Sequence, residues 1–207
     1  MMMALVSRGA IALSLFGLVT AGSVALTYQA TDEQIARNQK AVAIAALSEV
    51  LPAHDNDLLG SQVELPPAQA LGQTGNWDMT PAIQKGQLVA YAVPVRANDG
   101  YSGPIDMILA INMDGSVNGL RVVAHKETPG LGDKIDLAKS DWILDFNGKS
   151  LSNPDLEGWA PMPDGGEFDA FTGATITPRA VIEATARALA WHERTGRSQV
   201  QEAVNAN

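Results

Sequence analysis

The chain has 207 residues, of which 46% are hydrophobic and 18% are charged. This composition predicts one globular domain with an appendage and excludes an intrinsically disordered chain. The net charge of −9 would repel phosphate backbones, so nucleic acid is not an expected partner. There is no cysteine and there are three histidines. Disulfides, thiolate zinc sites and cysteine-held clusters are therefore excluded, no metal site is expected, and redox chemistry would need a bound organic cofactor.

An uncharged stretch lies between Arg8 and Asp32. Its residues 9–30 are mostly apolar or small, and about 20 such residues in a helix cross a bilayer core. Positive charge precedes the stretch and acidic residues follow it. The expected topology is therefore a cytoplasmic N-terminus at residues 1–8, one transmembrane helix at 9–30 in a bacterial inner membrane, and a periplasmic remainder. Small residues late in the stretch also permit a cleaved signal peptide, although the uncharged run is longer than the usual signal core.

Residues 31–75 are expected to connect the membrane segment to the external domain. Thr31 followed by Gln34 resembles a capping box, and apolar residues then recur on one helical face, which predicts a second helix over Asp32–Val50. Pro52 would end this helix. The rest of the segment is rich in proline and glycine, which predicts a loop.

Residues 76–207 are expected to form an α+β domain in which helices flank a small antiparallel sheet. The apolar run Leu88–Val95 predicts a strand, and Pro94 favours a place near an edge for its end. Two further apolar runs, Ile105–Asn112 and Val117–Ala124, are separated by an Asp-Gly turn, which predicts a hairpin.

The C-terminal part predicts a helix over Pro178–Arg194 that covers the sheet and ends at Gly196. Thr177 is a suitable N-cap and the following proline a suitable first helical residue. The small residues Thr172-Gly173-Ala174-Thr175 would then form a loop that enters a helix N-terminus, where unpaired N–H groups and the helix dipole favour a phosphate. An ordinary capped helix start has the same pattern.

A second segment of interest reads Glu127-Thr128-Pro129-Gly130-Leu131-Gly132. Its Pro-Gly pair marks a tight turn. Glu127 and Thr128 offer polar groups, and Leu131 an apolar contact, to a planar heterocycle. It is not a dinucleotide-binding fingerprint because the third glycine is missing. Taken alone, such a segment is most often a surface turn.

Together the two segments resemble the signatures of a covalent-FMN domain family. This family is shared by the G subunit of the Rnf ion-translocating oxidoreductase and the C subunit of the sodium-pumping NADH:quinone reductase. Its flavinylation motif, an Asp followed by Ser or Thr, Gly, Ala and the acceptor Thr, is matched by Asp169, Thr172, Gly173, Ala174 and Thr175. The resemblance implies that Thr175 carries FMN through a phosphoester on its side-chain oxygen. It also implies that a separate flavin transferase recognises these five residues.

The resemblance further implies which residues contact the flavin. The loop that approaches the ring would supply Glu127, Thr128, Gly130, Leu131 and Gly132. The residues expected around the phosphate are Thr172, Gly173, Ala174 and Thr177. No catalytic acid or base is implied, because Thr175 serves as an attachment point.

By this resemblance the chain is an electron-carrying subunit of an Rnf-type complex. The family complex couples electron transfer between ferredoxin and NAD to ion translocation, and the expected partners are its subunits A, B, C, D and E. The first alternative is an FMN subunit of the quinone reductase or of another extracytoplasmic electron-transfer chain. The second is a membrane-tethered scaffold or sensor without flavin.

Overall fold

The computed structural model describes residues 2–206, and for residues 2–8, 32, 33, 36 and 39 it describes the backbone alone. The expected cytoplasmic segment 1–8 thus begins outside the described residues, and the side chains of Arg8 and Asp32 also lie outside them. The chain divides into two compact units, Met1–Ala41 and Val42–Asn207. The whole sheet and its core belong to the second unit.

Helix α1, Met2–Val50, is continuous, so the predicted start of a second helix is wrong. The Thr31 hydroxyl does not cap a new helix. It donates to the carbonyl oxygens of Thr27 (2.9 Å) and Tyr28 (3.2 Å). The sequence from there to the end of α1 contains neither glycine nor proline, so nothing interrupts the helix before Pro52, where the prediction of its end is confirmed.

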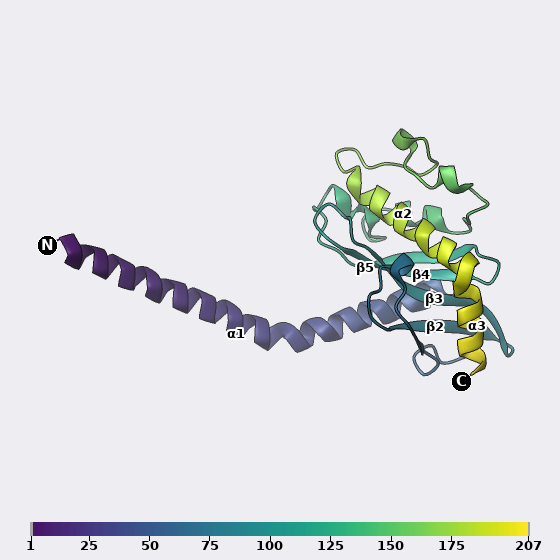
Figure 1. The fold of residues 1–207 in the computed structure, drawn as a ribbon, viewed down its shortest axis with the longest axis horizontal. Coiled ribbons are helices and arrows are strands. Elements are labelled where there is room, and N and C mark those ends of the chain that lie inside the picture. Colours follow the sequence, from purple (N-terminus) through teal and green to yellow (C-terminus); the bar gives the residue numbers. More distant parts are fainter. Residues whose placement is uncertain (1, 207) are drawn as a thin grey trace. The chain divides into compact units, whose positions relative to one another are not determined.

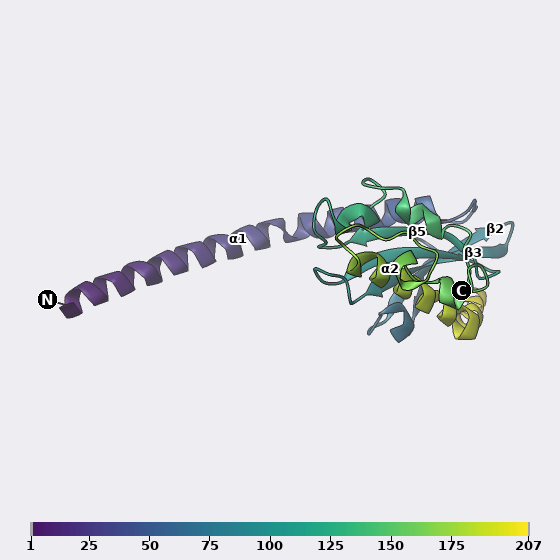
Figure 2. The same cartoon turned by 90° about the horizontal axis from the view of Figure 1, so that it is seen from above.

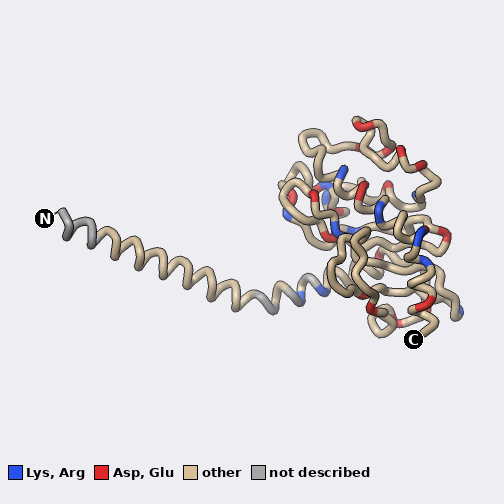
Figure 3. Tube along the Cα trace, viewed as in Figure 1, with Lys and Arg blue, Asp and Glu red and all other residues tan. Residues whose placement is uncertain are grey.

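Within α1, Gly9–Thr31 is long and apolar enough to cross a membrane, and no other helix among residues 2–206 meets that criterion. Figure 3 shows no charged residue along this part of α1. Four of its hydroxyl groups, those of Thr20, Ser23, Thr27 and Thr31, donate to carbonyl groups of the same helix, as a bilayer core would require. Thr20 donates to the Phe16 carbonyl and Thr27 to the Ser23 carbonyl, each at 2.9 Å.

Five antiparallel strands form one sheet in the order of the sequence (Figure 1). They are β1 Val63–Leu65, β2 Trp77–Gln84, β3 Gln87–Ala97, β4 Ile105–Asn112 and β5 Val117–Ala124. The β4–β5 hairpin confirms its prediction, and Gly115 in its turn has φ +90°. β1 lies in the stretch predicted to be a loop. β2 is not predicted, because a proline interrupts its short apolar run.

Pro94 lies in a central strand of the sheet, but at a place where one of its two neighbouring strands has already ended, which agrees with the prediction that the end of this strand lies near an edge. Strand β3 pairs with β2 on one side and with β4 on the other. The β2–β3 ladder reaches only Thr80 and Ala92. Pro94 therefore lies beyond that ladder, although it is paired with Ile108 of β4. A proline without an N–H is tolerated here because one neighbour is already absent.

The sheet is buried on both faces within the second unit (Figure 2). Alternate residues of β3 separate the two layers. Tyr91 and Val93 belong to the cluster that includes α2, Ile176–Trp191, whereas Ala90 and Ala92 meet the last turns of α1. Burial of both faces explains why the strands read as continuous apolar runs. It also confirms the predicted α+β fold, with the C-terminal helix covering the sheet.

The approach of α1 to the sheet depends on small residues. The α1 side of the sheet consists mainly of alanines, with Val50 and Leu47 packed on them. At Gly119 of β5, a Cβ would lie 2.9 Å from the Val50 Cα. The Val50 carbonyl also accepts a hydrogen bond from the Asn118 side chain at 2.5 Å. The end of α1 is thus fixed to the outer strand of the sheet.

Short 3₁₀ turns and aromatic packing organise the segment between β5 and α2. Its described 3₁₀ turns are Gly132–Ile135, Trp142–Phe146, Leu156–Gly158 and Met162–Asp164. A further 3₁₀ turn, Gln69–Leu71, lies between β1 and β2. Phe146 lies 5.2 Å from Trp142 and 4.6 Å from Phe168 between ring centroids. Trp142 in turn lies 4.9 Å from Phe171. These buried rings hold the segment that leads into α2.

The chain remains helical past Gly196, so the predicted end of the last helix is wrong. Helix α2 is followed by a π-turn at His192–Gly196 and by α3, Arg197–Asn205. A Cβ at Gly196 would lie 2.6 Å from ring carbons of Trp191. The glycine is therefore needed for close packing against the indole ring and does not stop the helix.

A buried polar pair lies at the junction of α2 and the π-turn. The Tyr91 hydroxyl and His192 Nδ1 are 2.5 Å apart, and both residues are buried. Burial raises the pKa of Tyr91. Burial lowers the pKa of His192, nearby Arg197 lowers it further, and Asp114 opposes the shift. His192 therefore binds a proton at a lower pH in the folded protein than in the unfolded chain.

This burial predicts a loss of stability in mild acid. The unfolded chain binds a proton at His192 near pH 6.5, but the folded chain binds it only at lower pH. The free energy of unfolding therefore falls as the pH drops below about 6.5 and levels off below the lowered pKa. Thermal unfolding of the full chain in detergent, from about pH 7.5 to about pH 5.5, should show a smaller loss of melting temperature in His192→Gln than in the wild type. Equal losses in the two proteins would contradict the assignment.

Candidate functional site

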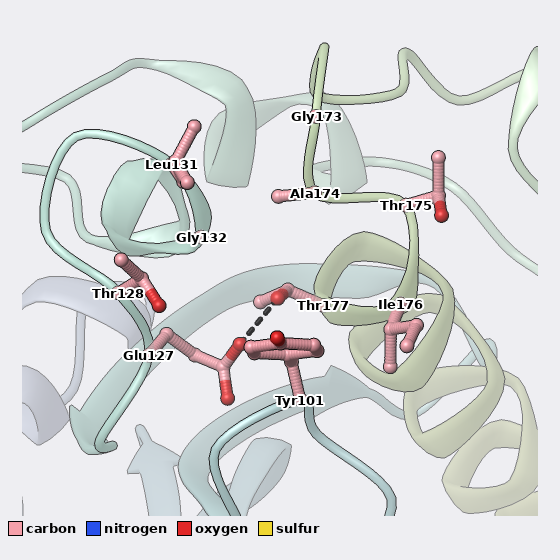
Figure 4. Close-up of a pocket in the computed structure, with 10 residues that line it drawn as sticks. All are labelled: Tyr101, Glu127, Thr128, Leu131, Gly132, Gly173, Ala174, Thr175, Ile176 and Thr177. Carbon is pink, nitrogen blue, oxygen red and sulfur yellow. Dashed lines mark hydrogen bonds between the residues drawn. The ribbon is translucent and has the colours of Figure 1, made fainter.

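A cavity of about 390 Å³ lies where three segments of the second unit meet. These segments are the loop between β3 and β4, the stretch after β5, and the start of α2. Figure 4 shows the side chains that they contribute. The lining residues are Tyr101, Glu127, Thr128, Leu131, Gly132, Gly173, Ala174, Thr175, Ile176 and Thr177.

One wall of the cavity is a tight turn that starts at Thr128. The N–H groups of Leu131 and Gly132 both donate to the Thr128 carbonyl at 3.1 Å. A proline in the second position and Gly130 in the third, with φ +80°, match a type II turn. The Asp133 carboxylate accepts the Gly130 N–H at 2.7 Å. The turn therefore presents Leu131 and Gly132 to the cavity.

The facing wall is a second tight turn, formed by Phe171–Ala174. The Ala174 N–H donates to the Phe171 carbonyl at 3.0 Å. Gly173 has φ +82° in the third position, which again matches a type II turn. A Cβ at Gly173 would lie 3.6 Å from a methyl group of Leu131. The two turns thus approach each other across the mouth of the cavity.

The Glu127 side chain joins the three segments. It is 4% exposed. Its Oε1 accepts the Ser102 N–H at 2.9 Å, and its Oε2 accepts the Thr177 hydroxyl (Figure 4). At Gly132 a Cβ would lie 2.8 Å from the Thr177 Oγ1 and 3.0 Å from the Glu127 Cβ. We call the Glu127 carboxylate with its two donors, the Ser102 N–H and the Thr177 hydroxyl, the Glu127 junction. Only glycine fits at position 132 without displacing this junction.

His125 supports the same loop from behind. The Glu127 N–H donates to His125 Nδ1 at 3.0 Å. Because Nδ1 is an acceptor, we place the ring proton on Nε2, which lies 3.0 Å from a carboxylate oxygen of Asp136. The imidazole thereby connects the start of the loop to Asp136, the residue just past the 3₁₀ turn Gly132–Ile135.

Helix α2 begins two residues earlier than predicted. Thr175 occupies the N-cap position and makes no side-chain capping bond. Thr177, the predicted N-cap, lies in the first turn, where it is buried and bonded to Glu127. The Thr175 side chain is exposed. The site therefore combines an exposed hydroxyl with the first-turn N–H groups of α2, which favour a phosphate.

The structure brings most of the predicted site residues together. Those that line the cavity are Glu127, Thr128, Leu131, Gly132, Gly173, Ala174, Thr175 and Thr177. Gly130, Thr172 and Asp169 do not line it. Gly130 and Thr172 are exposed turn residues, and Asp169 is an exposed residue whose carbonyl accepts the Trp142 indole N–H at 2.9 Å.

Two lining residues, Tyr101 and Ile176, are not predicted from the sequence. Tyr101 lies between Gly100 and Gly103, in the link between two predicted strands. An aromatic residue in such a glycine-bounded loop is a usable signal for a binding surface. Ile176 carries no comparable signal, because one exposed isoleucine is common on protein surfaces.

Comparison with known proteins gives two family matches. Residues 100–190 match the FMN-binding domain family, and residues 1–50 match the RnfG N-terminal region. The first match contains every residue that lines the cavity. The second covers α1 from its start to Val50.

Similar proteins extend over nearly the whole chain. A protein of Pseudomonas aeruginosa (strain UCBPP-PA14) is 46% identical over 188 residues, which cover 90% of this chain and 88% of that protein. A protein of Pseudoalteromonas atlantica is 42% identical over 192 residues, or 91% and 89% of the two chains. A protein of Vibrio atlanticus is 39% identical over 202 residues, or 97% and 96%. Each is named as the G subunit of an ion-translocating oxidoreductase complex. This chain, with its apolar N-terminal helix and its FMN-binding domain, therefore belongs to the family of ion-translocating oxidoreductase complex G subunits.

Proposed function

We propose that the protein carries FMN on Thr175 and transfers electrons as a subunit of an Rnf-type ion-translocating complex. The observation that carries this proposal is the position of Thr175. This exposed residue is the N-cap of α2 and lines the cavity, inside the segment that matches the FMN-binding domain family. The linkage is a phosphoester between the Thr175 side-chain oxygen and the phosphate of FMN, formed with the net loss of one water.

The surroundings of the three nearby threonines support this choice. Thr177 is buried and its hydroxyl is bonded to Glu127, so it cannot accept a phosphate without breaking that junction. Thr172 is exposed but does not line the cavity. Thr175 is both exposed and lines the cavity. Thr128 also meets these two conditions, but it starts a tight turn, whereas Thr175 is the N-cap of α2, where a phosphate is favoured.

The donor set of the cavity fits FMN. The first-turn N–H groups of α2 and its dipole would stabilise the remaining phosphate charge. Leu131 and Ile176 offer apolar contacts, and Thr128 offers a polar group, to a planar ring. When bound, FMN supplies one- and two-electron redox chemistry, and the protein supplies position and electrostatic environment. Asp169 and Thr172 lie outside the cavity lining, which suits a role in recognition by a flavin transferase.

We place the flavin domain in the periplasm, with α1 as a single anchor in the inner membrane and the N-terminus in the cytoplasm. The basic residue before the apolar stretch and the acidic residues after it support this orientation. A covalent link would prevent loss of the cofactor by dissociation. It would also leave the flavin ring free to exchange electrons.

The further redox centres of such a relay must belong to other chains, because this one has no cysteine to ligate clusters. We propose that it works with subunits A, B, C, D and E of the complex, which couples electron transfer between ferredoxin and NAD to ion transport. Alone it would turn over no substrate. The names of relatives that match almost the full chain favour this assignment over the quinone reductase.

Replacement of Thr175 tests the attachment. Thr175→Ala, produced as the full chain together with the flavin transferase, should lose both flavin fluorescence in a denaturing gel and the added mass of FMN less one water, because it lacks the acceptor oxygen. Thr195→Ala, which removes another exposed hydroxyl of the C-terminal helical region, should keep both signals. A fluorescent Thr175→Ala band would refute the attachment site. A wild-type band without flavin would favour the scaffold alternative.

Replacement of Glu127 tests the junction that shapes the cavity. Glu127→Ala leaves the Ser102 N–H and the Thr177 hydroxyl without their acceptor. The Thr177 hydroxyl is buried, and an unsatisfied buried group costs about 1–3 kcal/mol. The melting temperature of the full chain in detergent should fall clearly. Glu127→Gln, which keeps an oxygen acceptor and the shape of the side chain, should lose less.

The exposed Glu183 provides the control for that measurement. Glu183→Ala removes a carboxylate that lies 3.9 Å from Arg187 on the surface of α2, and it should change stability little. If Glu127→Ala were as stable as Glu183→Ala, the structural role of the junction would be wrong.

A further inference from the structure

Three large apolar side chains remain exposed around one cavity. Leu131 and Ile176 are each 42% exposed, and Tyr101 is 68% exposed. All three line the cavity beside Thr175. Single exposed apolar residues are common, but a group of them around a concave site marks a binding surface. Such a surface suits a flat apolar ring better than it suits a phosphate, and the helix start already offers a place for the phosphate.

Tyr101 is held in place although its ring is exposed. The next residue, Ser102, donates its N–H to the buried Glu127 carboxylate at 2.9 Å. On the other side, a Cβ at Gly100 would lie 3.0 Å from the same carboxylate and would also contact the Gly103 carbonyl closely. The loop backbone is therefore packed against the junction that fixes the start of α2. An aromatic side chain has two rotatable bonds, so a fixed backbone limits its ring to a few positions.

Figure 4 shows how the three apolar side chains are arranged. In this view Leu131 lies on one side of the cavity and Ile176 on the other, and the Tyr101 ring is seen between them. Tyr101 thus offers an aromatic ring within a cavity whose other apolar contacts are aliphatic. Aromatic rings pair with other flat π-systems in stacked or edge-on geometry, beyond the gain from burial alone.

We propose that Tyr101 is the aromatic partner of the isoalloxazine ring and sets its electronic environment. This inference rests on the proposed function, because it takes FMN on Thr175 as given. The electron-rich face of Tyr101 would favour the oxidised flavin over the more electron-rich reduced flavin, which lowers the reduction potential. Its phenol would also quench flavin fluorescence by donating an electron to the excited ring, with return of that electron in the dark.

The test uses the full chain in detergent, co-produced with the flavin transferase, in four forms. Wild type is compared with Tyr101→Leu, Tyr101→Phe and the control Tyr28→Leu, which removes an exposed phenol of α1. Flavin emission is divided by the amount of covalent flavin, taken from intact mass and from absorbance after denaturation. The reduction potential of each form is measured by spectroscopic titration.

Tyr101→Leu should raise emission per flavin severalfold and shift the potential upward. Tyr101→Phe should also raise the emission, because it lacks the phenol, but should keep a potential near that of the wild type, because it retains an aromatic face. Tyr28→Leu should match the wild type in both measurements. If Tyr101→Leu is not flavinylated, the inference is tested by the emission of Tyr101→Phe. Emission per flavin above that of the wild type supports the inference, and unchanged emission contradicts it.

Two outcomes would overturn the inference, and they are distinguishable. Covalent flavin in every form, with emission and potential unchanged by both Tyr101 substitutions, would refute the role of Tyr101 and leave the proposed function intact. Absence of the FMN mass from the wild type itself would refute the proposed function and, with it, the role of Tyr101.

Discussion

The buried carboxylate of Glu127 is the contact on which the site depends. It accepts hydrogen bonds from the loop between β3 and β4 and from the first turn of α2, while its own backbone belongs to the loop after β5. A buried carboxylate is costly unless it is fully paired, and here both oxygens have partners. Three segments that are distant in sequence are thereby fixed around one cavity. Gly100 and Gly132 lack side chains where a Cβ would displace this carboxylate.

The sheet supplies the rigid support for this junction. Both of its faces are buried, by α2 on one side and by the last turns of α1 on the other. The strands β3 and β5 end at segments that reach the cavity, and the aromatic cluster around Phe146 holds the segment that returns to α2. A cofactor on Thr175 would thus be positioned by regular structure, while its attachment point stays exposed to the maturation machinery.

The sequence predicts the parts of this fold that local chemistry determines. The Asp-Gly turn specifies the hairpin, and the two glycine-containing turns place Leu131 and Gly173 at the site. The sequence does not predict that α1 is continuous, because a threonine hydroxyl has two common roles. It can cap the start of a helix or donate to a carbonyl of the preceding turn, and the Thr31 hydroxyl has the second role because the helix continues on both sides of it. For the same reason Thr177 looks like an N-cap, whereas its hydroxyl is taken by Glu127. Tyr101 escapes prediction because its role depends on contacts with segments that lie far away in the sequence.

Site-resolved mass spectrometry of the mature chain tests the central claim most directly. Trypsin is expected to release one peptide from Ser150 to Arg179, which contains Thr172, Thr175 and Thr177. Fragmentation of this peptide by electron transfer, which preserves phosphoesters, locates the added FMN among the three. We predict that the fragments place the flavin phosphate on Thr175 alone. A flavin phosphate on Thr172 or Thr177, or an unmodified peptide from a chain matured with its transferase, would contradict the account.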